Sequence, residues 1–127
     1  MEILGNGVDI IQNSRIKNLI RNKKFILRVF SKNEINESKK TKNKANFFAK
    51  RFAAKEAFAK ALGTGIAKGI NFNEIIILNE KNGKPFIKLI NKTKKNVEKK
   101  LKKKKYKISL SLTDEDNYAV AFVTLSL

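Results

Sequence analysis

The chain has 127 residues, a length that predicts one compact domain over residues 1–127. It contains no cysteine and no histidine, which excludes disulfides, thiolate or imidazole metal sites and nucleophiles activated by histidine. The formal net charge of +18 favours an anionic partner. Any catalysis must therefore use carboxylates, lysines, hydroxyls and backbone groups.

The charge alone is a weak functional signal. Lysine supplies most of it, and such a lysine-rich composition can reflect nucleotide bias, so much of it is expected to be solvated surface. The four arginines are better clues than the many lysines. The chain has no 18-residue apolar run and no signal-peptide pattern, so we expect a soluble, cytoplasmic protein without a membrane partner.

The N-terminal third predicts one strand and several short helices. Residues 2–11 are β-rich and contain Gly5 and Gly7, which indicate close approach of another backbone or a ligand. Residues 14–29 have apolar side chains near helical spacing and basic side chains between them, predicting one or two amphipathic helices with a basic outer face. Ser31 and Glu34 form a capping-box pattern for a short helix, and residues 39–46 predict a lysine-rich loop.

Residues 47–62 predict a long central helix, because they are rich in alanine and contain no β-branched residue. Gly63 is expected to end it in the left-handed conformation. Glu56 projects from this helix among mostly apolar neighbours at helical spacing: Ala49, Phe52, Ala53, Ala59 and Lys60.

Two interpretations of Glu56 compete. It forms a solvated pair with Lys60 at i, i+4 spacing, or it is a metal ligand that needs a second carboxylate from elsewhere. Asp9 is the candidate for that second carboxylate, and its alternative role is a helix N-cap or a turn.

The C-terminal half predicts mostly strands. A glycine-rich loop over residues 64–71 leads to a hairpin, with strands over 74–78 and 85–90 joined by an Asn-Gly turn. An exposed helix over 91–105 follows, and its lysine run over 99–105 is expected to be solvated surface without a functional role. Strands over 108–112 and 118–125 complete an α+β domain, in which a small antiparallel sheet accompanies the central helix.

A basic nucleic-acid-binding domain is the rival function, supported by charge alone. Such a domain presents aromatic and basic side chains together on an exposed sheet. Most phenylalanines here lie in apolar stripes and are expected to be core: positions 47, 48, 52, 58, 72, 86 and 122. We therefore expect no nucleic-acid partner.

Three motifs carry a family resemblance. GVDI at residues 7–10, RFAAKEAFAKALGTGI at 51–66 and NGKP at 82–85 resemble the holo-acyl-carrier-protein synthases, which are 4′-phosphopantetheinyl transferases, in the same order over nearly the whole chain. The resemblance implies an enzyme of fatty acid biosynthesis that transfers 4′-phosphopantetheine from coenzyme A to a serine of apo acyl carrier protein and releases adenosine 3′,5′-bisphosphate. It also implies a homotrimer with active sites between subunits.

The resemblance also implies the site residues. Asp9 and Glu56 would bind Mg²⁺, which needs few protein carboxylates and no histidine. Because both carboxylates are present, a catalytically dead scaffold is disfavoured. Lys60, one turn beyond Glu56, would act with it in catalysis beside the coenzyme A phosphates. The expected coenzyme A site consists of Lys60, Gly63, Gly65, Lys84 and Pro85. The general base stays open between a metal-bound water, Glu56 and a carboxylate of the carrier protein.

The basic face of residues 14–29 would dock the acidic carrier protein through Arg15, Arg21, Lys24 and Arg28. The C-terminal hairpin departs from the family pattern. Many members have a Ser-His pair there, whereas this chain has Ser111 followed by Leu112. If the histidine binds a coenzyme A phosphate, another cation must replace it, and the candidates are Lys50, Lys55 and Lys84.

Overall fold

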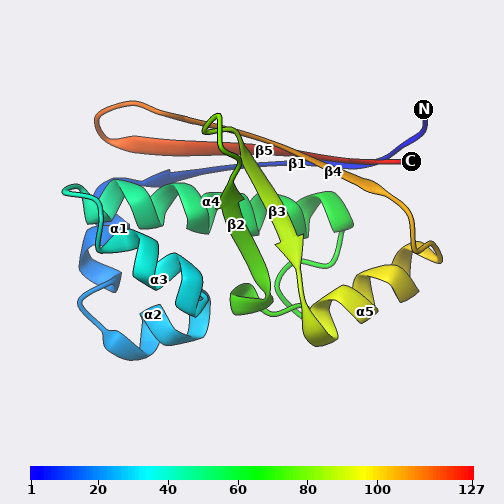
Figure 1. Ribbon diagram of the computed structural model, residues 1–127, viewed down its shortest axis with the longest axis horizontal. Coiled ribbons are helices and arrows are strands. Elements are labelled where there is room, and N and C mark those ends of the chain that lie inside the picture. The colour runs from blue at the N-terminus through cyan, green and yellow to red at the C-terminus, as the bar shows by residue number, and fades with distance from the viewer.

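A long helix packed on a three-stranded antiparallel sheet organises the structure, a computed structural model that describes residues 1–127. The sheet order is β1 (Ile3–Gln12), β5 (Tyr118–Ser126), β4 (Lys107–Asp114), and the helix is α4 (Lys44–Leu62). Helices α1–α3 lie beside the first half of α4, whereas the β2–β3 hairpin and α5 lie towards its second half (Figure 1). The remaining bounds are α1 (Asn13–Leu19), α2 (Lys23–Val29), α3 (Lys32–Ser38), η1 (Phe72–Glu74), β2 (Ile75–Asn79), β3 (Pro85–Leu89) and α5 (Asn91–Leu101).

Both ends of α4 have clear causes in the sequence. The Asn43 side chain accepts a hydrogen bond from the amide of Asn46, which caps the first turn. Gly63 ends the helix with φ 87°, as predicted. The helix starts three residues earlier than expected, because Asn43 supplies a cap within the presumed loop. The prediction of a central helix is confirmed.

Gly5 and Gly7 bring β1 against α4. A side chain at Gly5 would collide with the carbonyl oxygen of Ala61, and one at Gly7 with that of Ala57. The expectation of close backbone approach is therefore confirmed, and the partner is the central helix. These two contacts determine the position of β1 along the axis of α4.

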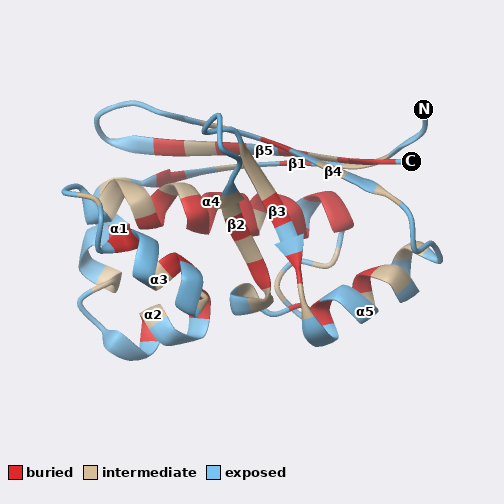
Figure 2. Cartoon of the chain, viewed as in Figure 1, coloured by how far each residue is buried: buried red, intermediate tan, exposed pale blue.

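The sheet has one buried and one exposed face. The buried face packs on α4 through residues that include Ile11, Ala121 and Val123, and Figure 2 shows buried positions running along α4 and the strands above it. The outer face is apolar yet open: Val8 keeps 54% and Phe122 45% of their accessible surface. Phe122 is thus not a core residue, and that prediction is wrong.

The C-terminal half has two sheets rather than one. The β2–β3 hairpin has the predicted antiparallel pairing but forms its own two-stranded sheet. Helix α5 ends at Leu101, four residues before the predicted end, because Lys102 turns the chain at φ 56°. Its inner side is buried at Thr93 and Val97, so α5 is less exposed than predicted. No helix has the length and apolar character needed to cross a bilayer.

Candidate active site

Asp9 and Lys60 meet between β1 and α4. Asp9 lies mid-strand opposite Ala121, and its side chain keeps 16% of its accessible surface. The Lys60 ammonium lies 3.1 Å from the Asp9 carboxylate and also donates to the Val8 carbonyl oxygen at 3.0 Å. The alternative of a helix N-cap or turn carboxylate is therefore wrong for Asp9.

Glu56 completes this group from the same helix as Lys60. Burial raises the pKa of the half-buried Glu56 carboxyl, and the charge of Asp9 raises it further, while Lys60 and Arg15 act in the opposite direction. The four charged groups are therefore close enough to influence one another. Lys60 pairs with Asp9 rather than with Glu56, so the solvated Glu56–Lys60 pair does not form.

The two carboxylates fit Mg²⁺ better than other protein-bound metals. No third carboxylate, histidine or cysteine joins them in a cluster. Zinc sites usually need three or four protein ligands and calcium needs six or more oxygens, whereas Mg²⁺ takes one or two carboxylates and keeps waters or substrate oxygens. Burial raises the pKa of Glu56 first and the like charge of Asp9 raises it further, and a cation bound beside the two carboxylates would offset both effects.

The structure does not bring all of the expected coenzyme A residues close to Asp9, Glu56 and Lys60. Gly63 and Gly65 follow α4 with φ of 87° and 63°, and both amides donate to the Ala59 carbonyl oxygen. They turn the chain one helical turn beyond Lys60. Lys84 and Pro85 lie in the β2–β3 hairpin, beside β4, which is at the opposite edge of the sheet from β1 and Asp9.

Arg51 is a candidate site residue that the sequence reasoning did not assign. It keeps 7% of its accessible surface, its Nε has no hydrogen-bond partner, and one Nη donates to the Phe47 carbonyl oxygen at 3.3 Å. Burial lowers the pKa of this guanidinium.

Arg51 lines a hollow of about 370 Å³ together with Lys50, Gly83, Pro85 and Asp114. A buried guanidinium with free donors beside such a hollow is suited to binding an anion. The available signal was the scarcity of arginine and the position of Arg51 at the start of the central motif.

The three lysines considered as replacements for the absent histidine have different environments in the structure. Lys55 is fully buried and bound to Glu34 at 2.7 Å, so this candidate is wrong. Burial lowers the pKa of Lys55 to about 8, although Glu34 raises it. Lys50 keeps part of its surface, with its ammonium 4.0 Å from Asp114, and Lys84 is exposed.

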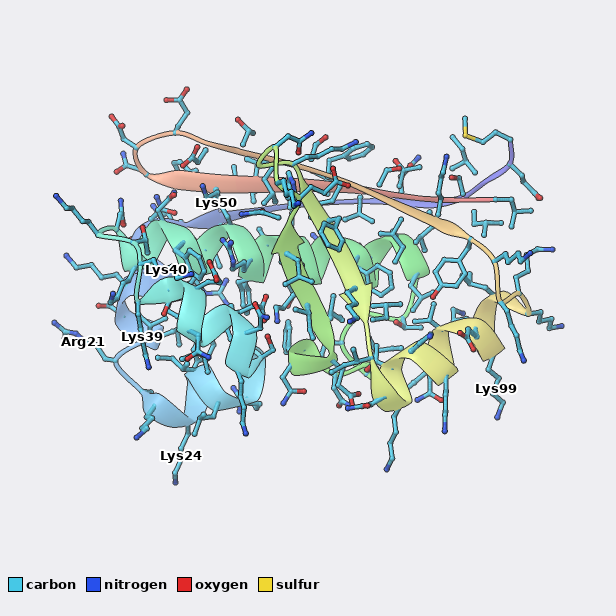
Figure 3. All side chains as sticks on the ribbon, viewed as in Figure 1. Arg21, Lys24, Lys39, Lys40, Lys50 and Lys99 are labelled. Atoms are coloured by element: carbon cyan, nitrogen blue, oxygen red, sulfur yellow. The ribbon has the colours of Figure 1, made fainter.

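The four predicted docking residues are all exposed on α1, α2 and the turn between them: Arg15, Arg21, Lys24 and Arg28. Arg21 and Lys24 project into solvent at this end of the molecule, and Lys99 projects from α5 at the other end (Figure 3). Of these four residues, Arg15 is the one whose charge acts on Glu56, lowering the pKa of that carboxyl against the larger effect of burial.

Comparison with known proteins assigns the family. The model of the 4′-phosphopantetheinyl transferase superfamily matches residues 5–123. The chain belongs to this superfamily. Among relatives of this family, a holo-[acyl-carrier-protein] synthase of Pelagibacter ubique is 50% identical over 125 residues, covering 98% of both chains. One of Ehrlichia chaffeensis is 48% identical and covers 97% of this chain and 96% of its own.

Solved structures of the family have the same fold. The synthase of Neisseria meningitidis superposes with a TM-score of 0.89 at 36% identity, covering 98% of this chain and 99% of that one. A Bacillus anthracis synthase in complex with CoA gives 0.82 at 35% identity, covering 99% and 98%. The resemblance found in the motifs and the α+β fold class are confirmed, and the chain is an enzyme of this family.

Proposed function

We propose that this chain transfers 4′-phosphopantetheine from coenzyme A to a serine of apo acyl carrier protein and releases adenosine 3′,5′-bisphosphate. The serine oxygen forms a bond to the phosphorus nearer pantetheine, the bond from that phosphorus to the bridging oxygen breaks, and the serine proton is lost. The observation that carries the proposal is the group of Asp9, Glu56 and Lys60, held between β1 and α4 by the family's own motifs.

Asp9 and Glu56 would hold Mg²⁺, and Lys60 would add a cation beside them. When bound, the ion supplies charge stabilisation for the phosphate oxygens of the pyrophosphate. Lys60 lies close enough to Asp9 that its ammonium would donate to a phosphate oxygen at the same place. Catalysis of this kind is mostly positioning and electrostatics, which suits a chain without histidine.

The remaining coenzyme A contacts would come from the glycine turn after α4 and from the β2–β3 hairpin. The space beside both glycines is open, since a Cβ atom at Gly63 or Gly65 would meet no atom within 4 Å. Pro85 lines the hollow that contains Arg51, and Lys84 lines a second hollow that also includes Pro85. We propose that a phosphate of coenzyme A binds in the hollow beside Arg51. Arg51, with Lys50 and Lys84, would then replace the histidine that this hairpin lacks.

A homotrimer with shared sites is the proposed assembly, and two observations support it. The outer face of the sheet exposes apolar side chains, with Ile10 keeping 62% of its surface beside Val8 and Phe122. The expected coenzyme A residue Lys84 lies beside β4, whereas the expected metal ligand Asp9 lies on β1 at the opposite edge of the sheet, so one chain does not join them. A neighbouring copy would cover the apolar face and supply the second edge.

The basic face of α1 and α2 would dock the acyl carrier protein. Arg15, Arg21, Lys24 and Arg28 are exposed and lie on the side of the molecule where Arg15 approaches Glu56. A carrier bound there would present its serine near the carboxylate pair. We place the reaction in fatty acid biosynthesis in the cytoplasm, on the basis of the family.

The rival nucleic-acid function gains nothing from the exposed sheet. Phe122 is open there, but its cross-strand neighbours are Val8 and Ser111 rather than basic residues.

Incubation with coenzyme A, Mg²⁺ and apo acyl carrier protein tests the proposal directly. Intact-protein mass spectrometry should show the carrier gaining one phosphopantetheine group. Omitting Mg²⁺ and mutating the carrier serine to alanine are the controls, and both should abolish the gain. A carrier of unchanged mass in the complete reaction would refute the proposed function.

A further inference from the structure

Lys55 forms a fully buried junction on the far side of α4 from the sheet contact. Its ammonium donates three hydrogen bonds: to the carbonyl oxygen of Val29 at 2.7 Å, to Glu34 Oε1 at 2.7 Å and to the carbonyl oxygen of Phe72 at 2.9 Å. Both charged side chains have no accessible surface. All three ammonium protons are therefore used, each on a different segment of the chain.

Glu34 extends this junction to the cap of its own helix α3 and to one further segment, β2. Its Oε1 also accepts from the amide of Ser31 at 2.9 Å, and its Oε2 accepts from the amide of Ile77 at 3.1 Å. The pair therefore ties the end of α2, the start of α3, η1 and β2 to one position on α4.

Two of the bonded groups lie at the ends of elements: Val29 ends α2 and Phe72 begins η1. Val29 is the last residue of α2, and helix-end carbonyls have no partner within their own helix. Val29 directly follows Arg28, and Lys55 directly precedes Glu56. The junction therefore connects the basic docking helix to the residue beside the carboxylate pair.

Stability alone does not account for a junction of this kind. Apolar residues of similar volume often stabilise a fold as well as a buried ion pair does, because removing two charges from water is costly. Hydrogen bonds, unlike apolar contacts, fix direction, so this pair determines how α2 is oriented on α4.

We propose that Lys55 and Glu34 are positioning residues that hold the carrier-docking helix α2 in register with Glu56. The inference rests on the proposed function, because it assigns α2 to carrier docking. The pair would not touch either substrate. Its loss should weaken productive carrier binding while leaving coenzyme A binding nearly unchanged.

The test compares Glu34→Gln and Lys55→Met with Val97→Ala, a destabilised control at a buried position of α5, which supplies no hydrogen-bonding group to this junction. Each protein is assayed well below its melting temperature with carrier and coenzyme A varied separately. For both junction variants we expect the carrier KM to rise at least about fivefold and the coenzyme A KM to stay within about twofold. Val97→Ala should change neither KM.

The double variant Glu34→Leu/Lys55→Met separates orientation from stability. Removing both charges should restore much of the melting temperature lost in Lys55→Met, while the carrier KM stays high. Should Lys55→Met not fold, Glu34→Gln and the double variant carry the comparison. Unchanged carrier KM in the folded junction variants would overturn the inference. An inactive wild-type protein would instead refute the proposed function.

Discussion

At the scale of single residues, Glu56 combines its proposed role as a metal ligand with a cost in stability. Its folded-state pKa is raised, first by burial and then by Asp9. Between the ordinary carboxyl pKa and this raised value, the folded state binds more protons than the unfolded state, so stability falls as pH rises through that window. Above that window the penalty of the ionised carboxylate is fully present.

Glu56→Gln is therefore expected to make the metal-free protein more stable at pH 7. The gain should disappear as pH falls below the ordinary value of about 4.5, where the wild-type carboxyl is neutral in both states. Thermal melting in a chelator across pH measures this. Glu115→Gln, at an exposed position, is the control and should show no such gain. A variant less stable than wild type at pH 7 would contradict the assignment of Glu56 as a strained carboxylate.

The proposed metal-binding pair, Asp9 and Glu56, predicts a non-additive loss of activity. Asp9→Asn and Glu56→Gln keep shape while removing one charge each, so turnover should fall about 10²-fold or more in each, or about 2.7 kcal/mol. The double variant should be little worse than the worse single one, since both act through one ion. Mg²⁺ titrations of turnover for the three variants provide the measurement. Near-wild-type activity of Glu56→Gln would exclude the metal-site role.

Sequence reasoning was uneven at this scale for a physical reason. The pairing of Asp9 with Glu56 was implied by the family motifs, whereas the glycines of β1 indicated only that another backbone or a ligand approaches closely. The roles of Lys55 and Arg51 could not, because burial of a helical side chain depends on which distant segments cover it. A helical wheel predicts the direction in which a side chain projects, but not which distant segments pack over it.

At the scale of elements, the docking face gives a prediction specific to one substrate. Reversing Arg15 and Arg28 to Glu places two acidic groups on α1 and α2, which should repel an acidic carrier. The carrier KM is expected to rise strongly and the coenzyme A KM to stay nearly constant. Steady-state kinetics at modest salt measures both. An unchanged carrier KM would indicate that this basic face is solvated surface and does not dock the carrier.

The lysine run after α5 is expected to behave differently. Lys102, Lys103 and Lys104 are exposed and follow the end of the helix, and their side chains form no salt bridge or hydrogen bond within the chain. Replacing all three by Gln should leave turnover within about threefold, under about 1 kcal/mol. A tenfold loss in the transfer assay would show that this segment contributes to a binding site.

The strands show what alternation can and cannot predict. The hairpin of β2 and β3 and the pairing of β4 with β5 followed from turn residues and apolar runs, and both are confirmed. The outer face was missed, because β5 carries apolar residues on both sides and gives no polar alternation. Phe122 has the sequence context of a core residue, but it lies on the outer face of β5 and is exposed in the single chain.

At the scale of the whole molecule, the open apolar face and the divided site have one common explanation. Val8, Ile10 and Phe122 form a face that a single chain leaves in water. Burying it between copies would be favourable at about 25 cal/mol per Å² of apolar surface. Phe122→Glu should therefore yield a smaller species by light scattering and lose transfer activity. A wild-type monomer at working concentration would contradict the trimer.

Mixing two inactive variants tests whether the site is shared between subunits. One variant, Glu56→Gln, lacks the carboxylate edge, and the other, Arg51→Gln/Lys84→Gln, lacks the hairpin edge. If each site takes one edge from each of two neighbours, random mixed trimers contain intact sites, and activity should recover to about a quarter of wild type. Refolding the two variants together and separately gives the comparison. A site contained within one chain predicts no recovery, because every chain in the mixture lacks one edge.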